Sequence, residues 1–115
     1  MLEKWLQRPP GGRCNQKAVM TDLCFTSVPE LSRLLATRQV SSRELLDAFL
    51  AQIDRANPSL NAIVTFDREG AYANADAVDA RRVAGLPTSP LAGLPIAIKD
   101  MEPVKGMRTT MGSPI

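Results

Sequence analysis

The sequence contains no histidine, and this absence excludes several kinds of active site. A Ser-His-Asp triad, a Cys-His pair and a zinc site with histidine ligands each need at least one imidazole. Any acid–base step near neutral pH within these residues has to use a lysine, a carboxylate or a cysteine whose pKa is shifted. The composition therefore agrees with lysine-based chemistry but does not require it.

Long apolar runs, cysteines and an excess of one charge are scarce as well. No apolar run approaches the roughly eighteen residues of a membrane span, so we expect no membrane contact. Fourteen basic side chains against twelve acidic ones give a net charge of +2, which is too small to indicate nucleic-acid binding. Cys14 and Cys24 have no C-x-x-C spacing, and no secretion signal is in view. We interpret them as free thiols in a reducing compartment, or as one thiol with the other cysteine in a disordered tail, and we expect a cytoplasmic protein.

Residues 1–19 differ from the rest of the chain. The run Pro9-Pro10-Gly11-Gly12 interrupts any helix, and the surrounding charges are mostly basic. A transit peptide would be similarly basic, but it would also be amphipathic and rich in serine. We expect a disordered extension, with residues 20–115 as the folded part and a natural start at Met20 as an alternative.

Two helix starts follow one another in the next part. Ser27–Glu30 has the S-x-x-E form of a capping box, with Pro29 in the first turn. Apolar residues at helical spacing then extend this helix to about Thr37; they are Leu31, Leu34 and Leu35. Ser41–Glu44 is a second capping box, and its helix is expected to end at Asn57–Pro58. The apolar stripe of this second helix consists of Leu45, Leu46, Phe49, Leu50 and Ile53.

The pair Ser41-Ser42 resembles a pair of catalytic serines only superficially. It has no glycine-rich surroundings that would expose a nucleophile. Ser41 already has a backbone group to bind at the helix start. We therefore interpret the pair as part of a helix cap.

Two short segments are predicted to be strands of a sheet. Residues 60–66 alternate between two partly apolar sets. Residues 94–98 form an apolar run without alternation, which is typical of a strand buried on both faces. Between them, Asp67 is placed to cap a helix that runs to Val83, with Gly85 just after its end. The order helix, helix, strand, helix, strand predicts an α/β fold.

Lys99 follows the second apolar segment with no polar transition. A lysine at the end of a buried strand is partly desolvated, which disfavours the ammonium form and favours a neutral amine that can act as a base. The carboxyl ends of strands in open α/β sheets are also where ligands bind. By position alone, however, a lysine that pairs with Asp100 or reaches into water is the commoner case. Position makes Lys99 a candidate and no more.

A longer motif surrounds this lysine. Residues 90–100 read PLAGLPIAIKD, followed by Val104-Lys105-Gly106 and by Thr109-Thr110-Met111-Gly112-Ser113. In order and spacing, this block closely resembles the first motif block of the amidase signature family. The resemblance extends over residues 26–113. It implies the α/β fold of that family, in which helices pack on a mixed β-sheet, with residues 20–115 as the N-terminal part of the domain.

The resemblance also implies an activity. In the family, the lysine at the position of Lys99 is the base of a Ser–cis-Ser–Lys triad that hydrolyses amides through an acyl-enzyme. The two serines belong to a Gly-Gly-Ser-Ser-Gly-type segment, which is not found among these 115 residues. The chain is thus expected to be inactive alone, while a full-length relative would act on a small-molecule amide without a metal or an organic cofactor. A non-catalytic binding or regulatory module, the front end of the A subunit of a glutamine-dependent amidotransferase, and a homodimer stay open as alternatives.

Asp100 conflicts with this role for its neighbour, because a carboxylate close by holds a lysine in its charged form. Adjacent side chains of a strand point to opposite faces, so we expect Asp100 to bond backbone or loop groups rather than Lys99. Two interpretations of Thr109 and Thr110 are equally good. One is a turn held by side-chain hydrogen bonds, and the other is a role near the lysine.

Overall fold

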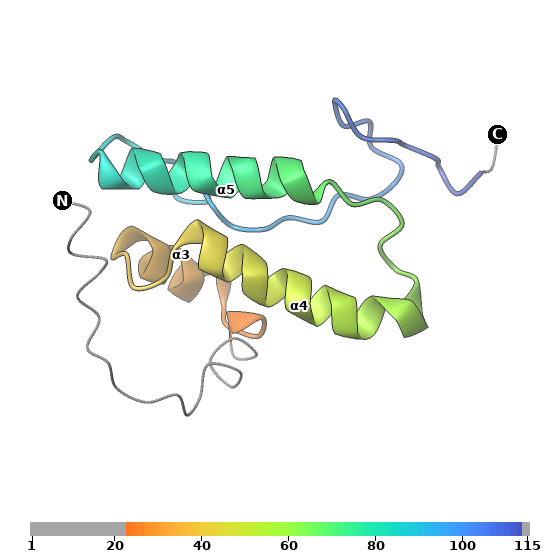
Figure 1. Cartoon of the computed structure of the whole chain (residues 1–115), viewed down its shortest axis with the longest axis horizontal. Coiled ribbons are helices and arrows are strands. Elements are labelled where there is room, and N and C mark those ends of the chain that lie inside the picture. The colour runs from red at the N-terminus through yellow and green to blue at the C-terminus, as the bar shows by residue number, and fades with distance from the viewer. Residues whose placement is uncertain (1–22, 114–115) are drawn as a thin grey trace.

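The structure is a computed structural model that describes residues 23–113 (Figure 1). Its helices are α3 (Val28–Ala36), α4 (Ser42–Leu60) and α5 (Arg68–Val83). α4 and α5 lie side by side and run in opposite directions, and α3 lies at the end where α4 begins (Figure 1). The chain after α5 turns back and follows the two helices as an irregular segment (Figure 1). The predictions for residues 1–19, Cys14 and Met20 fall outside the described residues.

A first apolar cluster joins α3 to the start of α4. Its buried members are Leu23, Leu31, Leu35, Leu45 and Ala48. Leu35 and Leu45 are 1% and 0% exposed, and burying one such side chain contributes about 2 kcal/mol. The helical spacing of the leucines in the sequence is confirmed by this cluster.

A second, smaller cluster holds α5 against α4. It consists of Leu46, Leu50 and Ala75, with Ile53, Ala71 and Tyr72 packed around them. Ala75 is the one buried residue of α5. The alanine-rich sequence of α5 predicts this thin apolar face. Because the apolar contact is small, polar contacts contribute much of what holds the two helices together.

The capping box at the start of α4 is confirmed. The Ser41 hydroxyl accepts a hydrogen bond from the backbone N–H of Glu44 at 3.0 Å, and the N–H of Ser41 donates to the Glu44 carboxylate at 3.0 Å. The two serines at this position are therefore part of a helix start, as the sequence indicates.

The capping box predicted at the start of α3 is wrong. Ser27 is the N-cap residue, but its side chain makes no cap hydrogen bond. The carboxylate of Glu30 instead accepts two hydrogen bonds from Arg33, at 2.6 and 2.8 Å. A bidentate, charge-assisted pair is stronger than a bond to a neutral backbone N–H, so Arg33 wins the competition for Glu30. Pro29 does stand in the first turn, as predicted.

α4 continues past the predicted stop at Asn57–Pro58 and ends at Leu60. A proline in the last turn removes a single hydrogen bond, which a helix end tolerates. The helix stops at Asn61, whose φ of 49° is left-handed. The side chain of Asn57 then fastens the chain beyond it, because its amide donates to the Ile63 carbonyl at 3.0 Å and accepts from the Ile63 N–H at 2.9 Å.

Both predicted ends of α5 are confirmed. The Asp67 carboxylate accepts a hydrogen bond from the N–H of Gly70 at 2.9 Å. At the other end Gly85 has a φ of 70°. Its N–H donates to the Arg82 carbonyl at 3.2 Å, and the N–H of Leu86 donates to the Arg81 carbonyl at 3.0 Å. This pair of bonds is a Schellman motif, in which glycine supplies the left-handed residue.

The sheet of the predicted α/β fold is absent from the described residues. Residues 61–67 and 94–99 are irregular, and no strand is formed anywhere in the range 23–113. Ile96 and Ile98 are 83% and 52% exposed, so the expected burial of this segment on both faces is wrong. A strand needs a second strand to bind its N–H and C=O groups, and residues 23–113 do not offer one. The fold prediction holds for the helices alone.

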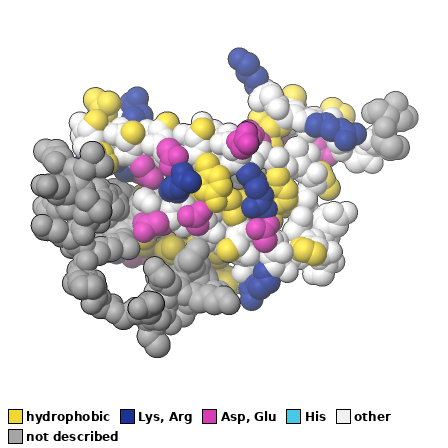
Figure 2. Space-filling model, viewed as in Figure 1, with side chains coloured by type: hydrophobic (Ala, Val, Ile, Leu, Met, Phe, Trp, Pro, Cys, Tyr) yellow, Lys and Arg dark blue, Asp and Glu magenta, His cyan; other side chains and the backbone are white. Residues whose placement is uncertain are grey.

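Several large apolar side chains lie at the surface around the irregular segments. They include Leu60, Val64, Leu91, Ile96, Ile98 and Met111, each more than half exposed. In Figure 2, apolar side chains fill the space between the two long helices, and acidic and basic side chains border it. Within residues 23–113, no helix combines the length and the apolar character needed to cross a membrane.

The difference between the two predicted capping boxes can be measured. Ser41→Ala removes a hydroxyl that accepts a helix N–H, so we expect the free energy of unfolding to fall by about 1 kcal/mol. Ser27→Ala removes no cap bond and should change it by less than about 0.5 kcal/mol. Urea denaturation followed by circular dichroism gives both values. Equal losses in the two variants would contradict the assignment of the caps.

Candidate functional site

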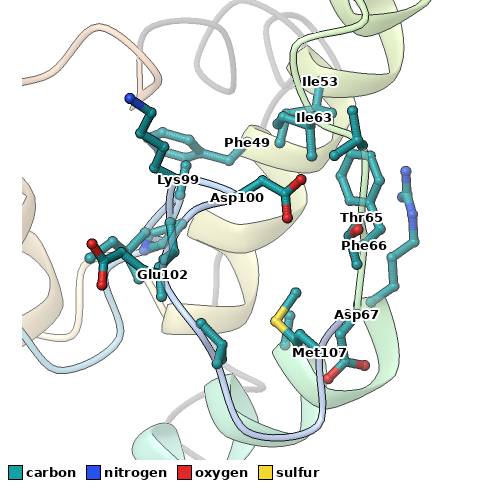
Figure 3. Close-up of a pocket in the computed structure, with 18 of the residues that line it drawn as sticks. Phe49, Ile53, Ile63, Thr65, Phe66, Asp67, Lys99, Asp100, Glu102 and Met107 are labelled. Atoms are coloured by element: carbon teal, nitrogen blue, oxygen red, sulfur yellow. The ribbon is translucent and has the colours of Figure 1, made fainter. Parts of the chain in front are cut away.

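Lys99 lies at a hollow of about 960 Å³ beside α4. One wall of the hollow is formed by apolar side chains of α4 and of the connection to α5 (Figure 3); they include Leu46, Phe49, Ile53, Ile63 and Phe66. The opposite wall is formed by the segment from Gly93 to Gly112, which carries Lys99 and Asp100. The motif block of the sequence therefore forms one side of a largely apolar hollow.

The side chain of Lys99 points away from the side chain of Asp100 (Figure 3). Lys99 is exposed, which corrects the expectation of a lysine desolvated at the end of a buried strand. Ile96, Ala97 and Ile98 just before it are themselves exposed, because no second strand within residues 23–113 pairs with this segment. The backbone carbonyl of Lys99 accepts a hydrogen bond from the N–H of Glu102 at 3.0 Å, so Lys99 begins a turn.

Asp100 and Thr110 close the loop that follows Lys99, and we call this contact the Asp100–Thr110 clasp. The N–H of Thr110 donates to one carboxylate oxygen of Asp100 at 2.8 Å, and the Thr110 hydroxyl donates to the other. The N–H of Met111 also donates to the Asp100 carbonyl at 3.0 Å. The prediction that Asp100 bonds loop groups rather than Lys99 is confirmed. Of the two interpretations of Thr110, the structure shows the one in which it holds a turn.

The clasp changes the acidity of Asp100. The hydroxyl of Thr110, and after it the backbone N–H of Thr110, hold the pKa of Asp100 below its usual value. The physical cause is that hydrogen bonds donated to a carboxylate stabilise its charged form. Arg108 contributes a smaller electrostatic effect in the same direction.

Upstream of Lys99, a group of four residues fastens the chain to both long helices; we call Ser42, Asp79, Arg82 and Ala92 the helix junction. The Asp79 carboxylate accepts hydrogen bonds from the N–H groups of Ser42 and Arg43, at 2.8 and 3.1 Å. The Arg82 guanidinium donates to the Ser42 hydroxyl at 2.8 Å and to the Ala92 carbonyl. Ser42 is fully buried, at 0% exposed. The segment that leads to Lys99 thus starts at a fixed point.

Gly93 allows the backbone to approach this junction closely. Its φ is 85°, and an added Cβ would lie 2.2 Å from the Ser42 hydroxyl oxygen and 3.0 Å from a nitrogen of Arg82. Both the left-handed conformation and the lack of space require glycine here.

The sequence does not reveal the helix junction. Asp79 and Arg82 are one turn apart on α5, a spacing that is common on any solvated helix face. Their partner Ser42 is 37 residues before Asp79 in the chain. The weak apolar face of α5 is the one signal that points to polar contacts between the helices.

Other chemistry is poorly supported by the described residues. Cys24 is present as a thiol, and burial raises its pKa, which makes it a weak nucleophile. Across residues 23–113, no three cysteine, aspartate or glutamate side chains gather closely enough to hold a metal ion.

The comparisons with known proteins agree with the motif block. A family model described as Amidase matches residues 44–115. Two similar curated proteins are both named as the A subunit of glutamyl-tRNA(Gln) amidotransferase. The one from Azoarcus sp. (strain BH72) is 55% identical over 87 residues, which are 76% of this chain and 18% of that protein. The one from Salinispora arenicola (strain CNS-205) is 46% identical over 96 residues, which are 84% of this chain and 20% of that protein.

The chain spans about a fifth of the length of these curated relatives. No solved structure shows significant similarity to it.

The clasp predicts a specific pH dependence. The pKa of Asp100 is lowered in the folded chain, so the stability that the clasp contributes is fully present above about pH 4, where a free aspartate titrates, and is lost as the pH falls through the lower folded value. Thr110→Val removes the hydroxyl and should raise the pKa of Asp100 toward its usual value, though not fully, because the backbone N–H remains. A carboxyl-detected NMR titration measures this pKa directly.

Thr109→Val is the matched control for that titration. The Thr109 hydroxyl donates its hydrogen bond to the Glu102 carbonyl at 3.5 Å rather than to the Asp100 carboxylate. In Thr109→Val the pKa of Asp100 should therefore be the same as in the unsubstituted chain. An equal change in both variants would show that the clasp is not the cause.

The close approach at Gly93 predicts a large loss of stability on substitution. Gly93→Ala introduces a methyl group that overlaps Ser42 and strains a left-handed residue, so the free energy of unfolding should fall by about 3 kcal/mol. Gly85→Ala is the control, since Gly85 has a similar φ of 70° but no atom within 4 Å of an added Cβ. It should lose about 1 kcal/mol. Urea denaturation compares the two, and similar losses would argue against the contact with Ser42.

Proposed function

Because the chain belongs to the amidase family, we propose that it supplies the base of an amide-hydrolysing site and that Lys99 is this base. Lys99 stands in the motif block that indicates the family, within the residues that the family model matches. Its place at the edge of the hollow leaves room for a substrate beside it. A largely apolar wall suits the exclusion of water, which a lysine base requires.

The observation that carries this proposal is the direction of Asp100. A carboxylate next to a lysine keeps the lysine protonated and so removes its basicity. Here both carboxylate oxygens of Asp100 accept hydrogen bonds from Thr110, and the side chain of Lys99 points the other way (Figure 3). The neighbour that would disable the base is thus engaged elsewhere.

The proposed chemistry is amide hydrolysis through an acyl-enzyme. The neutral amine of Lys99 takes a proton from the cis-serine hydroxyl, which takes the proton of the nucleophilic serine as that serine attacks the amide carbon. The C–N bond then breaks, the proton passes to the leaving amine, and water releases the acyl group. Both serines would come from a Gly-Gly-Ser-Ser-Gly-type segment, as the family resemblance implies.

The proposal requires that further protein covers Lys99. Burial away from water disfavours the ammonium form of a lysine and so favours its action as a base. Lys99 is exposed in the described part of the chain, whereas the curated relatives are about five times as long as the region they share with it. We propose that the remainder of an amidase domain packs over the hollow and desolvates the amine.

For the whole protein we propose the role that the curated relatives' names give. Each relative is named as one component of an amidotransferase for glutamyl-tRNA(Gln). This favours the amidotransferase alternative over a free amidase, and it implies that the whole protein works together with other chains. A homodimer and a cytoplasmic location stay predictions from the sequence.

A chimera tests the role of Lys99. The matching segment of the Azoarcus sp. relative, 55% identical over 87 residues, is replaced by the segment from this chain, and release of ammonia from glutamine is measured. We expect Lys99→Met to lower the rate by about a thousandfold or more, since triad members act as a unit. The 115-residue chain alone should show no turnover, because it has no matching serine pair.

Lys105→Met is the matched control, because Lys105 is an exposed lysine in the same motif block. It should leave the rate nearly unchanged. A chimera that hydrolyses glutamine equally well with Lys99→Met would remove Lys99 from the chemistry.

A further inference from the structure

We propose that Arg82 is a positioning residue for Lys99. This inference rests on the proposed function, because the segment that Arg82 fastens matters for catalysis only if Lys99 is the base. Arg82 belongs to α5, yet its side chain reaches the start of α4 at Ser42 and the backbone of Ala92. It therefore joins both long helices to the segment that leads to Lys99.

The geometry of the guanidinium suits a spacer between two groups. One of its terminal nitrogens donates to the Ser42 hydroxyl and the other to the Ala92 carbonyl. The group is planar and its N–H directions are fixed, so two bonds from one fork set the distance and the orientation between their acceptors. The side chain of Arg82 is only 11% exposed, so water competes little for these bonds.

The charge of Arg82 is compensated within the junction. A carboxylate oxygen of Asp79 lies 3.8 Å from a terminal guanidinium nitrogen of Arg82, and the Asp79 side chain is 24% exposed. The same carboxylate accepts two backbone hydrogen bonds at the start of α4. A charged pair that is mostly buried, and whose members each have hydrogen bonds to other groups, holds its geometry better than an exposed pair. The fork of Arg82 thus has a rigid support on α4 as well as on α5.

Within residues 23–113, few other contacts fix the position of Lys99 relative to the helices. Gly93 lies against Ser42, and Leu94 packs on the first apolar cluster. After that, Pro95 fixes one backbone angle, while Ile96 is 83% exposed and packs poorly. The Asp100–Thr110 clasp beyond Lys99 bonds one part of the loop to another. The helix junction is therefore the point from which the place of Lys99 is set.

This role is separable from the stability of the helix pair. α4 and α5 are also held by the second apolar cluster and by the hydrogen bonds that Asp79 accepts from the start of α4. Arg82→Lys keeps the positive charge near Asp79, but an ammonium group cannot reproduce the fork. We expect this variant to loosen the segment before Lys99 while the helices persist.

Hydrogen exchange of the full 115-residue chain tests whether Arg82 holds the segment before Lys99. The amides of Ala92 and Leu94 donate to Ser89 and Leu91 in the native turn, and their exchange should become about tenfold faster in Arg82→Lys. Amides in the middle of α4 should change by less than about twofold. Arg82→Gln, which keeps one planar donor, serves as a second variant.

Arg81→Lys is the matched control. Arg81 is the neighbouring arginine, is exposed, and donates to the Pro87 carbonyl in the same loop at 3.0 Å. Arg81→Lys alters an exposed hydrogen bond to the same loop but affects no bond to Ser42 or Ala92, so exchange at Ala92 and Leu94 should stay as in the unsubstituted chain. Equal effects of Arg81→Lys and Arg82→Lys would overturn the proposal. Loss of the helices in both Arg82 variants would overturn it too, since Arg82 would then serve overall stability.

The chimera with the Azoarcus sp. relative tests whether the position of this segment affects catalysis. If Arg82 positions the base, Arg82→Lys lowers kcat for glutamine hydrolysis by about tenfold and leaves KM unchanged, because substrate binding is not disturbed. An unchanged kcat would overturn the proposal. The two proposals fail separately. Full activity of the Lys99→Met chimera would contradict the proposal that Lys99 is the base. Unchanged exchange at Ala92 and Leu94 in Arg82→Lys would contradict only the proposal that Arg82 positions Lys99.

Discussion

A single carboxylate at the start of α4 organises the described part of the chain. The first turn of a helix has N–H groups without partners inside the helix, and a buried helix start must bind them elsewhere. Asp79 of α5 accepts the N–H groups of Ser42 and Arg43, while the Ser41 hydroxyl accepts that of Glu44. The negative charge also lies at the positive end of the α4 dipole, where it is stabilised. A helix with one buried residue, α5, is in this way held at a defined place on α4.

The path of the chain after α5 follows from that contact. Because Asp79 holds the start of α4 against α5, Arg82 can reach the Ser42 hydroxyl and the Ala92 carbonyl together. Gly93 then passes close to Ser42, where any side chain would collide. The backbone leaves the junction toward the hollow beside α4, and Lys99 is reached a few residues later. A polar contact between two helices thus determines where the segment that carries Lys99 begins.

The sequence predicts most of the features that depend on neighbours in the chain and misses those that depend on distant residues. The capping box at Ser41–Glu44, the cap at Asp67 and the left-handed Gly85 each involve groups within a few residues, and all are present. The box at Ser27 fails because Arg33 competes for Glu30. The strands fail because their exposed segments have no pairing partner in the range 23–113. For the site, the motif block singles out Lys99. The direction of Asp100 is predicted from the alternation of side chains on a strand, and it is observed although the strand is not. The helix junction joins residues too far apart in the chain to be recognised.

The proposed role of Lys99 and the observed role of Asp100 have opposite requirements, and the clasp is what reconciles them. Asp100 has to stay ionised to hold the loop, whereas a base at Lys99 has to give up its proton. In water the charge of Asp100 would be screened, but once protein covers the hollow the lower effective dielectric strengthens its pull on the lysine. Hydrogen bonds from Thr110 stabilise the charge on Asp100, and they hold the carboxylate turned away from the amine (Figure 3). Under the proposed role of Lys99, the clasp therefore matters more in a covered site than in the exposed one, because burial favours a neutral amine and also strengthens the effect of the nearby carboxylate.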